Sequence, residues 1–425
     1  MIYKLPSNVL YGNEAISLEM PEHWEVHISQ IKGFRAPALT REQILSRINS
    51  PIGAEPICRG ARGKKSAVII IDDITRPTPC REIAETVLSQ LSEAGVPKNN
   101  IWFIAALGAH GTMYREDFIR KLGEKIVEEY EVYNHNAFYN HDFLGVTDNG
   151  IPIEINSDVM RAEYKIAIGT MMPHSFYGFS GGAKSILPGI ASIKTIVENH
   201  KFTSPKEFNM GNRKTLIRED AEQAARMMGL DYKIDVILNG KAEMAELYCG
   251  DFEEEAKEAR LFASRHYMAE FVPDCDIVIS NSYFKPLEAG CAYTPETIES
   301  LKQGGSYVLA ANSPYGVCVH YLYDKWGHTA PGGVLYAGLY EPSEKMDEMI
   351  VFSQYTVKGM RDSWFIDESK GAKYCSRWRD VLVLLDDGRE KKVAVYPMAD
   401  SQILDNSLKY YTSCLLYTSP SPRDS

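Results

Sequence analysis

The stretch AVIIIDDITRPTP at residues 67–79 joins an apolar run to a cluster of charged side chains. Four of its first five residues are β-branched, which predicts a buried strand over 67–71. A helix is predicted over 81–94, because its apolar residues recur at helical spacing and Gly95 and Pro97 follow it. These residues therefore form a strand-to-helix unit with charged side chains where the strand ends.

The same alternation continues along the chain. Further strands are predicted at 101–107, 164–170 and 234–238, and further helices at 115–130, 191–200 and 214–228. Strands that alternate with helices are typical of an α/β fold, in which helices flank a mainly parallel sheet. We therefore predict a doubly wound parallel sheet for this part of the chain.

A second unit is predicted beyond a charged connecting helix at 252–267. Its predicted elements are strands at 276–280, 306–310, 381–385 and 392–396 and a helix at 295–303. We therefore expect two domains, 1–270 and 271–410, each a mainly parallel sheet flanked by helices. Residues 413–425, SCLLYTSPSPRDS, have no hydrophobic periodicity and are predicted to be a non-native tail.

Composition and charge argue against several classes of protein. The 425 residues are 44% hydrophobic and 24% charged, with a net charge of −11, which suits a soluble cytoplasmic protein and disfavours a nucleic-acid partner. No apolar run reaches the ~18 residues of a membrane span, and the first residues lack the apolar core of a signal peptide. The eight cysteines include no C-x-x-C pair, which argues against a zinc ribbon or a disulfide framework.

Charged and imidazole side chains follow three of the predicted strands. Asp73 and Arg76 come after the first, His110 after the second, and the loop PHSFYGFSGGAK at 173–184 after the third. The carboxyl ends of parallel strands meet at one edge of a sheet, where ligands bind in such folds. We therefore expect one site that combines Asp73, Arg76 and His110 with His174 and Lys184 of the loop.

These residue types suit chemical roles but also have structural explanations. The planar guanidinium of Arg76 suits a carboxylate, and Asp73 would orient a base or a hydroxyl, whereas a structural pair would only brace the loop. His110 and His174 suit proton transfer on the two sides of a substrate carbon, although each alone is more simply a polar loop histidine.

Lys184 follows a Ser-Gly-Gly-Ala run that lets a bulky group approach the backbone. A lysine there suits a phosphate contact, a Schiff base or a covalent cofactor anchor, and is otherwise a surface lysine. His200 ends a predicted helix, where an imidazole suits a metal or the helix dipole. A zinc site of His110, His174 and His200 stays open, although no close spacing supports it.

Longer stretches resemble the nickel-dependent lactate racemase family. They are YGNEAISLEMP at 11–21, PIGAEPI at 51–57, DDITRPTP at 72–79, GVTDNGIPIEIN at 145–156 and PHSFYGFSGGAKSILPGIASIKTIVENH at 173–200. The resemblance implies an isomerase of two domains with its active site in the interdomain cleft. Its expected activity is racemisation or epimerisation of a small 2-hydroxy acid at C2.

The resemblance also implies a cofactor made by dedicated synthesising enzymes. This is a nickel pincer nucleotide, a pyridinium-3-thioamide-5-thiocarboxylate mononucleotide that carries nickel. The matching residues are Lys184 as its covalent anchor, His200 as the nickel ligand, and Phe176, Ser180, Gly181, Gly182 and Pro188 around it. His110 or His174 would take the hydroxyl proton while the substrate hydride moves to the cofactor and back, and Asp73 and Arg76 would hold the substrate.

The chain departs from the family where the substrate carboxylate is expected. The family usually carries Tyr-Gln-Ala-x-Lys at the position of Tyr293, Thr294 and Thr297. Loss of a buried cation there would cost about 2 to 5 kcal/mol of binding free energy. We therefore expect a 2-hydroxy acid that is larger or more hydroxylated than lactate and that contacts these three residues.

Three alternatives make different predictions. A zinc-dependent hydrolase that uses His110, His174 and His200 would hold zinc and form no adduct on Lys184. A non-catalytic homologue would bind the pincer nucleotide without turnover, and a Schiff-base enzyme would be trapped at Lys184 by borohydride. The remaining histidines, which include His320 and His328, are given no role.

Overall fold

The computed structural model describes residues 1–201, 210–314, 316–322, 342–356 and 368–406. Its first sheet has the strand order β13, β12, β9, β4, β5, β6, and only β13 runs antiparallel to its neighbour. The strands are β4 (Ala67–Asp72), β5 (Ile101–Ala106), β6 (Glu131–Asn134), β9 (Tyr164–Thr170), β12 (Tyr232–Leu238) and β13 (Met244–Gly250). The mainly parallel sheet that the sequence predicts is therefore confirmed.

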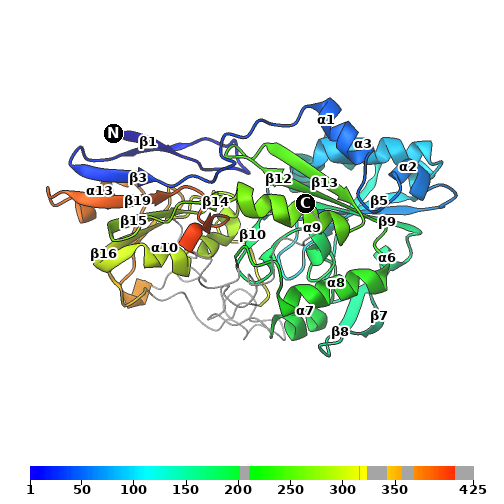
Figure 1. The fold of residues 1–425 in the computed structure, drawn as a ribbon. Helices are drawn as coiled ribbons and strands as arrows, with labels where there is room; N and C mark the ends of the chain where they lie inside the picture. The colour runs from blue at the N-terminus through cyan, green and yellow to red at the C-terminus, as the bar shows by residue number, and fades with distance from the viewer. Residues whose placement is uncertain (202–209, 315, 323–341, 357–367, 407–425) are drawn as a thin grey trace, which may run out of the picture.

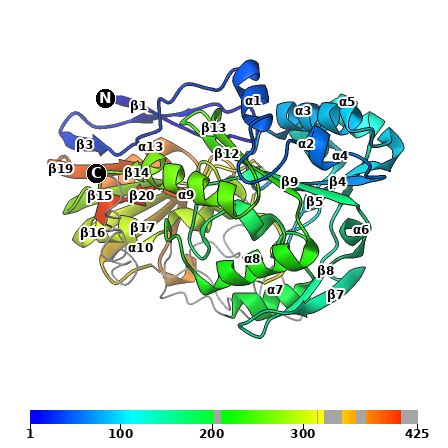
Figure 2. The same cartoon turned by 45° about the vertical axis from the view of Figure 1, so that its right-hand side comes forward.

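Helices cover both faces of this sheet, as Figures 1 and 2 show. They are α1 (Arg41–Ile48), α2 (Ile57–Gly60), α3 (Cys80–Glu93), α4 (Arg115–Leu122), α5 (Glu124–Glu129), α6 (Ser157–Met160), α7 (Ile193–His200), α8 (Leu216–Met228) and α9 (Glu254–His266). Alternate residues of β4 pack on opposite sides, Ile69 in one core with α3 and Ile70 in the other with α8. A strand buried on both faces explains the unbroken apolar run at 67–71.

The second sheet has the order β18, β17, β16, β15, β19, β3, and all of its strands are parallel. The strands are β3 (Trp24–Ile28), β15 (Cys275–Asn281), β16 (Leu301–Ala310), β17 (Met346–Phe352), β18 (Lys373–Cys375) and β19 (Lys391–Tyr396). Its helices are α10 (Pro295–Glu299) and α13 (Trp378–Leu385). One edge strand, β3, comes from the start of the chain, so this sheet combines segments from both ends of the sequence.

Shorter elements complete the described structure. The strands β1 (Ile2–Leu5) and β2 (Ile16–Glu19) form a hairpin, as do β7 (His141–Val146) with β8 (Pro152–Asn156) and β10 (Pro173–His174) with β11 (Gly178–Phe179). The strands β14 (Met268–Ala269) and β20 (Ile403–Leu404) pair in parallel. Short 3₁₀ turns lie at Lys98–Asn100, Gly182–Ser185, Pro286–Ala292 and Glu368–Lys370.

Three sequence-based element predictions are wrong. The helix expected over 115–130 is two helices, because Gly123 takes a φ of 83° that a helix does not allow. The helix expected over 295–303 ends at Glu299, and pairing with β15 draws the following residues into β16. The strand expected over 381–385 belongs to α13, where Trp378, Val381 and Leu385 bury one helical face.

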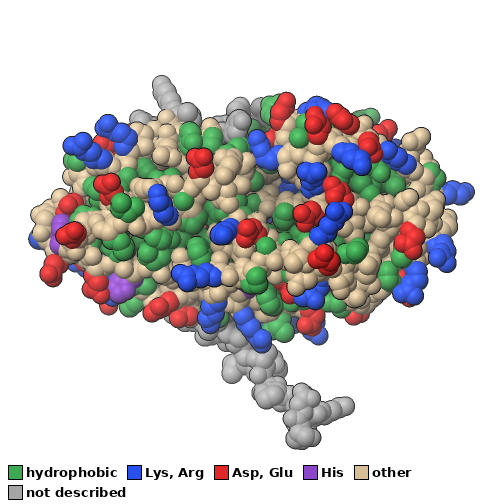
Figure 3. Space-filling view, turned by 90° about the horizontal axis from the view of Figure 1, so that it is seen from above, with side chains coloured by type: hydrophobic (Ala, Val, Ile, Leu, Met, Phe, Trp, Pro, Cys, Tyr) green, Lys and Arg blue, Asp and Glu red, His purple; other side chains and the backbone are tan. Residues whose placement is uncertain are grey.

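Two further findings concern the surface and the ends of the chain. Charges of both signs are interspersed on the face seen from above in Figure 3, unlike a nucleic-acid surface. In the part of the chain that the structure describes, no helix has the length and apolar character to cross a bilayer. The expected tail at 413–425 and His328 lie outside the described residues, and the domain boundary near 270 stays a prediction.

Candidate active site

The loop that follows β4 is held in place by a buried lysine of α4. Lys121 donates to the carboxylate of Asp72, to the carbonyl of Asp73 at 2.9 Å and to the carbonyl of Arg76 at 3.0 Å. All three ammonium hydrogens are thus used, which satisfies a charge that would be costly to bury alone. The side chains of Asp73 and Arg76 therefore project from a rigid backbone.

Asp73 is bonded directly to His110, as the order of the strands predicts. Its Oδ2 lies 2.6 Å from Nδ1 of His110, and its Oδ1 accepts from the backbone amide and the hydroxyl of Thr75. Burial opposes the charge on the ring, but the carboxylates of Asp73 and Glu288 outweigh it and raise the pKa of His110 to about 9. His110 is therefore an oriented imidazole that holds its proton at neutral pH.

Glu288 is a site residue that the sequence analysis missed. It lies in the 3₁₀ turn Pro286–Ala292 after β15, accepts from Nη1 of Arg76, and has Oε1 3.5 Å from Nε2 of His110. Burial raises its pKa, but the charge of Arg76 lowers that pKa well below its ordinary value. The carboxyl-edge rule used for the first sheet, applied to β15 of the second, would have pointed to this residue.

His320, to which no role was given, also lies beside His110. The two ring centroids are 5.0 Å apart, and the amide of Tyr321 donates to the carbonyl of Ala109. Among the described residues, His110, Glu288 and His320 bring three potential ligand atoms within 4.8 Å of one another, a group that differs from the three histidines proposed from sequence. The raised pKa of His110 opposes metal binding here, because a metal must displace the ring proton.

His174 lies in the β10–β11 hairpin, and its pKa is shifted in the opposite direction from that of His110. Its Nδ1 accepts from the amides of Phe176 at 3.2 Å and Tyr177 at 3.4 Å, which assigns the proton of the neutral ring to Nε2. Burial, followed by the charge of Lys184, lowers its pKa well below 6.5. The site thus contains one imidazole that favours the charged form and one that favours the neutral form.

The loop before Lys184 is built against a buried carboxylate. Gly182 donates its amide to Asp235, and a Cβ added at Gly181, whose φ is 75°, would lie 2.7 Å from Oδ2 of Asp235. Asp235 is itself paired with Lys233, and both side chains are fully buried. Glycine is therefore required at 181 by space as well as by backbone conformation.

Lys184, His174 and His200 surround the ring of Tyr177. The ammonium of Lys184 lies 5.3 Å from the ring centroid, and the rings of His174 and His200 lie 5.7 Å and 6.0 Å from it. Tyr177 is fully buried and donates to Oδ1 of Asn199 at 2.7 Å. This aromatic residue, which the sequence analysis left out, brings the end of α7 to the Lys184 loop.

Burial lowers the pKa of the basic groups around Tyr177. Burial, then the charge of Arg76, lowers the pKa of Lys184 to about 7, and burial lowers that of His200 to about 4. Nδ1 of His200 bonds the carbonyl of Ile196 at 2.9 Å, so the ring proton sits there and the lone pair is on Nε2. A neutral amine and a neutral imidazole are the forms that a covalent tether and a metal ligand require.

Other residues expected around a cofactor lie in the same region but differ in role. Phe176 packs near His174 with ring centroids 6.2 Å apart, and Pro188 lies against Gly108, next to the His110 loop. The hydroxyl of Ser180 donates to the carbonyl of Thr170 at 2.7 Å. Ser180 therefore holds the loop, and its contact with a cofactor stays a prediction.

The three residues expected at the substrate carboxylate are engaged within the second unit. Thr294 and Thr297 form the capping box of α10, and Oγ1 of Thr297 also lies 2.6 Å from the hydroxyl of Tyr307. The hydroxyl of Tyr293 accepts from the amide of Ser343 at 3.0 Å. The hydroxyls of the two threonines are thus engaged at the start of the helix and in the core, and their contact with substrate stays a prediction.

Comparison with known proteins identifies the family. The lactate racemase of Lactiplantibacillus plantarum is 30% identical over 345 residues, which cover 79% of this chain and 78% of that protein. The chain belongs to the lactate racemase family. Residues 11–211 match the lactate racemase N-terminal domain, and the lactate racemase of Thermoanaerobacterium thermosaccharolyticum is 28% identical over 72% of this chain and 74% of that protein. This lactate racemase family member is accordingly an isomerase.

Solved structures agree with the fold of this lactate racemase family member. The lactate racemase apoprotein from Thermoanaerobacterium thermosaccharolyticum superposes with a TM-score of 0.72 at 22% identity, over 95% of this chain and 100% of that one. A protein from Thermotoga maritima superposes with a TM-score of 0.65 at 17% identity, over 87% and 98% of the two chains. The α/β fold with mainly parallel sheets is therefore common to all three.

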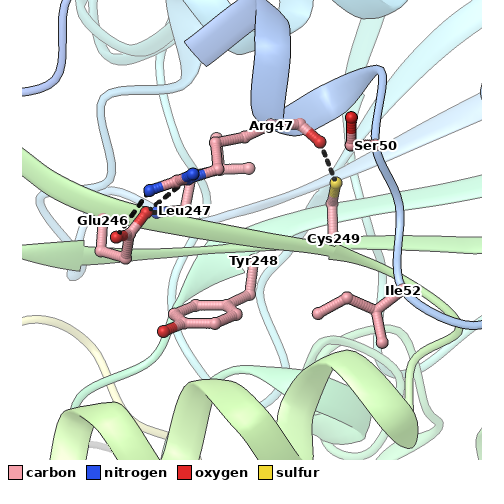
Figure 4. Close-up of a pocket in the computed structure, with 7 residues that line it drawn as sticks. All are labelled: Arg47, Ser50, Ile52, Glu246, Leu247, Tyr248 and Cys249. Atoms are coloured by element: carbon pink, nitrogen blue, oxygen red, sulfur yellow. Dashed lines mark hydrogen bonds and ion pairs between the residues drawn. The ribbon is translucent and has the colours of Figure 1, made fainter. Parts of the chain in front are cut away.

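A separate surface pocket lies beside β13, at the end of α1 (Figure 4). It has a volume of about 310 Å³ and is lined by Arg47, Ser50, Ile52, Glu246, Leu247, Tyr248 and Cys249. Nε of Arg47 pairs with Glu246 at 2.8 Å, and Sγ of Cys249 donates to the carbonyl of Arg47. None of the expected site residues lines this pocket, so the racemase chemistry is not assigned to it.

Proposed function

We propose that this lactate racemase family member racemises or epimerises a small 2-hydroxy acid at C2, with a nickel pincer nucleotide tethered to Lys184. The observation that carries the proposal is the grouping of Lys184, His174 and His200 around Tyr177. Such a grouping puts an anchor, a proton-transfer group and a metal ligand within one site. Enzymes that synthesise the nucleotide are its implied partners.

The chain's residues fit this cofactor. The pKa of Lys184 is lowered to about 7, so a neutral amine, the form that can be acylated, is available near pH 7, and the glycines at 181 and 182 leave space beside it. His200 would offer Nε2 to nickel, because its Nδ1 is bonded to Ile196. When bound, the pincer nucleotide would supply the acceptor for the C2 hydride and return it to either face.

The two imidazoles would handle the hydroxyl proton. Asp73 holds Nδ1 of His110, so the proton is taken up and released at Nε2 of that ring. His174, whose neutral ring carries its proton on Nε2, would donate a hydrogen bond to the substrate oxygen, which stabilises the carbonyl form of a 2-keto acid. The neutral fraction of His110 would accept the hydroxyl proton and return it, while His174 keeps its own proton; because both enantiomers carry this hydroxyl, the same pair would serve either one.

The test is the intact mass of the chain expressed with the cofactor-synthesising enzymes, followed by peptide mapping. We expect a mass increase on Lys184 with bound nickel, no increase in Lys184→Arg, and an unchanged increase in Lys194→Arg, an exposed lysine of α7. Racemisation of 2-hydroxy acids should be lost in Lys184→Arg and kept in Lys194→Arg. An unmodified Lys184, or turnover that survives Lys184→Arg, would contradict the proposal.

A further inference from the structure

Most charged groups of the site are bonded to an opposite charge. Lys121 pairs with Asp72, His110 with Asp73, and Arg76 with Glu288. Within the described part of the site, the ammonium groups of Lys184 and Lys285 have no carboxylate bonded to them. On the proposed function Lys184 becomes a neutral thioamide, which leaves Lys285 as a buried cation next to the His174 hairpin whose ammonium bonds only carbonyls.

Lys285 lies at the junction of the two sheets, on the segment that follows β15. It is 1% exposed, and its Nζ donates to the carbonyls of Pro173 at 2.8 Å and Asp400 at 2.6 Å. Pro173 precedes His174, and the charge of Lys285 lowers the pKa of both His174 and Lys184. Two neutral carbonyls leave one ammonium hydrogen without an acceptor, because the carboxylate of Asp400 bonds the backbone amide of Lys285 at 2.6 Å and not its Nζ.

We propose that Lys285 binds the substrate carboxylate in this enzyme, in place of the lysine that the family carries at the position of Thr297. The inference rests on the proposed function, since it names the group that holds the substrate of that same site. Thr297 cannot serve, because its hydroxyl is engaged with Tyr307 and Thr294. Lys285 is therefore the specificity-determining cation of the reaction.

The same arrangement defines the class of substrate. Nη1 of Arg76 donates to Glu288, so this guanidinium is already engaged and is not offered to a second carboxylate of the substrate. A dicarboxylate would also bring a negative charge beside Glu288, which is costly at a buried site. The expected substrate is thus a 2-hydroxy acid with one carboxylate, whose further groups are neutral and able to donate hydrogen bonds to Glu288.

The test is calorimetric binding of three probes to the full purified chain: glycolate, its neutral amide glycolamide, and the dicarboxylate tartronate. Lys285→Gln removes the charge but keeps hydrogen-bond donors for the two carbonyls. Lys165→Gln is the matched control, since Lys165 also bonds a carbonyl, that of Ala162 at 2.9 Å, at the opposite end of β9. Thermal melting checks that each variant folds.

Wild-type and Lys165→Gln proteins should bind glycolate alike and more tightly than tartronate. Lys285→Gln should weaken glycolate binding by about 30-fold or more and leave glycolamide unchanged. Equal glycolate affinity in Lys285→Gln, tartronate bound as tightly as glycolate, or no glycolate binding by the wild type would overturn the inference. Binding needs neither adduct nor turnover, so failure of the racemase proposal is seen separately in the mass and turnover measurements.

Discussion

At the scale of single residues, the site depends on two imidazoles with opposite proton affinities. Asp73 and Glu288 stabilise the charged form of His110, whereas burial and the charge of Lys184 keep His174 neutral. His320 also lies beside His110, but an imidazole carries no negative charge and therefore does not stabilise the charged form of His110. Burial and neighbouring charges, rather than residue type, therefore separate the roles of two histidines that look alike in the sequence.

The first prediction concerns the titration of His110. We expect its ring to titrate at a pKa of about 9 in the wild type and at a lower pH in Asp73→Asn, because the largest charge that raises the pKa is removed. Since the folded-state pKa lies above 6.5, this contribution to stability is full below pH 6.5 and is lost as the pH rises through about 9. The turnover rate should rise over the same range, as the neutral ring forms.

Ring-carbon NMR measures this titration directly. Asp231→Asn is the control, since that carboxylate lies at the start of β12 and accepts from the amide of Lys165 instead. An unchanged His110 titration in Asp73→Asn would mean that the carboxylate does not hold the ring.

At the scale of elements, the start of α10 gives a structural role to Thr294 and Thr297, which stand where the family carries Gln and Lys. Thr294 accepts from the amide of Thr297, and the side chain of Thr297 returns to the cap backbone. The helix begins there, and its first turn packs into the second sheet's core through Ile298. The two threonines thus stabilise a helix end rather than a ligand.

The second prediction follows from this cap. Thr294→Ala should lower the free energy of unfolding by about 1 kcal/mol and leave the KM for a 2-hydroxy acid unchanged. Thr40→Ala is the matched control, because Thr40 forms the capping box of α1 away from the site. Urea unfolding and steady-state kinetics give the two quantities, and a KM that rises only in Thr294→Ala would restore the substrate role of this residue.

At the scale of the whole molecule, the two sheets are interdependent. The strand β3 pairs with β19, and Leu5, Leu18 and Trp24 share one core with Ile277 and Val308. The ion pair between Arg76 and Glu288 links the carboxyl edges of the two sheets. The site therefore exists only when both units are folded and in contact.

The third prediction tests this dependence. A fragment of residues 271–425 should fail to unfold cooperatively, because it lacks β3 and the apolar side chains of the N-terminal hairpin. Residues 1–29 joined through a flexible linker to 271–425 should restore a cooperative transition. Circular dichroism during urea unfolding distinguishes the two, and equal cooperativity in both would show that the N-terminal segment is dispensable.

The sequence alone determined much of the first sheet and the set of residues that follow its strands. The apolar runs at 67–71, 101–107 and 164–170 predicted buried strands, and the rule that their carboxyl ends meet at one edge brought Asp73, Arg76 and His110 together. Local periodicity carries that information, because burial on both faces leaves a continuous apolar run.

Only the tertiary structure decided which groups from the second unit complete the site. Glu288 and Lys285 are far from Arg76 and His174 in the chain, and no local pattern distinguishes a buried ionic contact from a surface charge. The same holds for β3, whose place beside β19 depends on a partner at the other end of the chain. Contacts between distant segments are set by the packing of whole sheets, whereas periodicity reports only on neighbours along the chain.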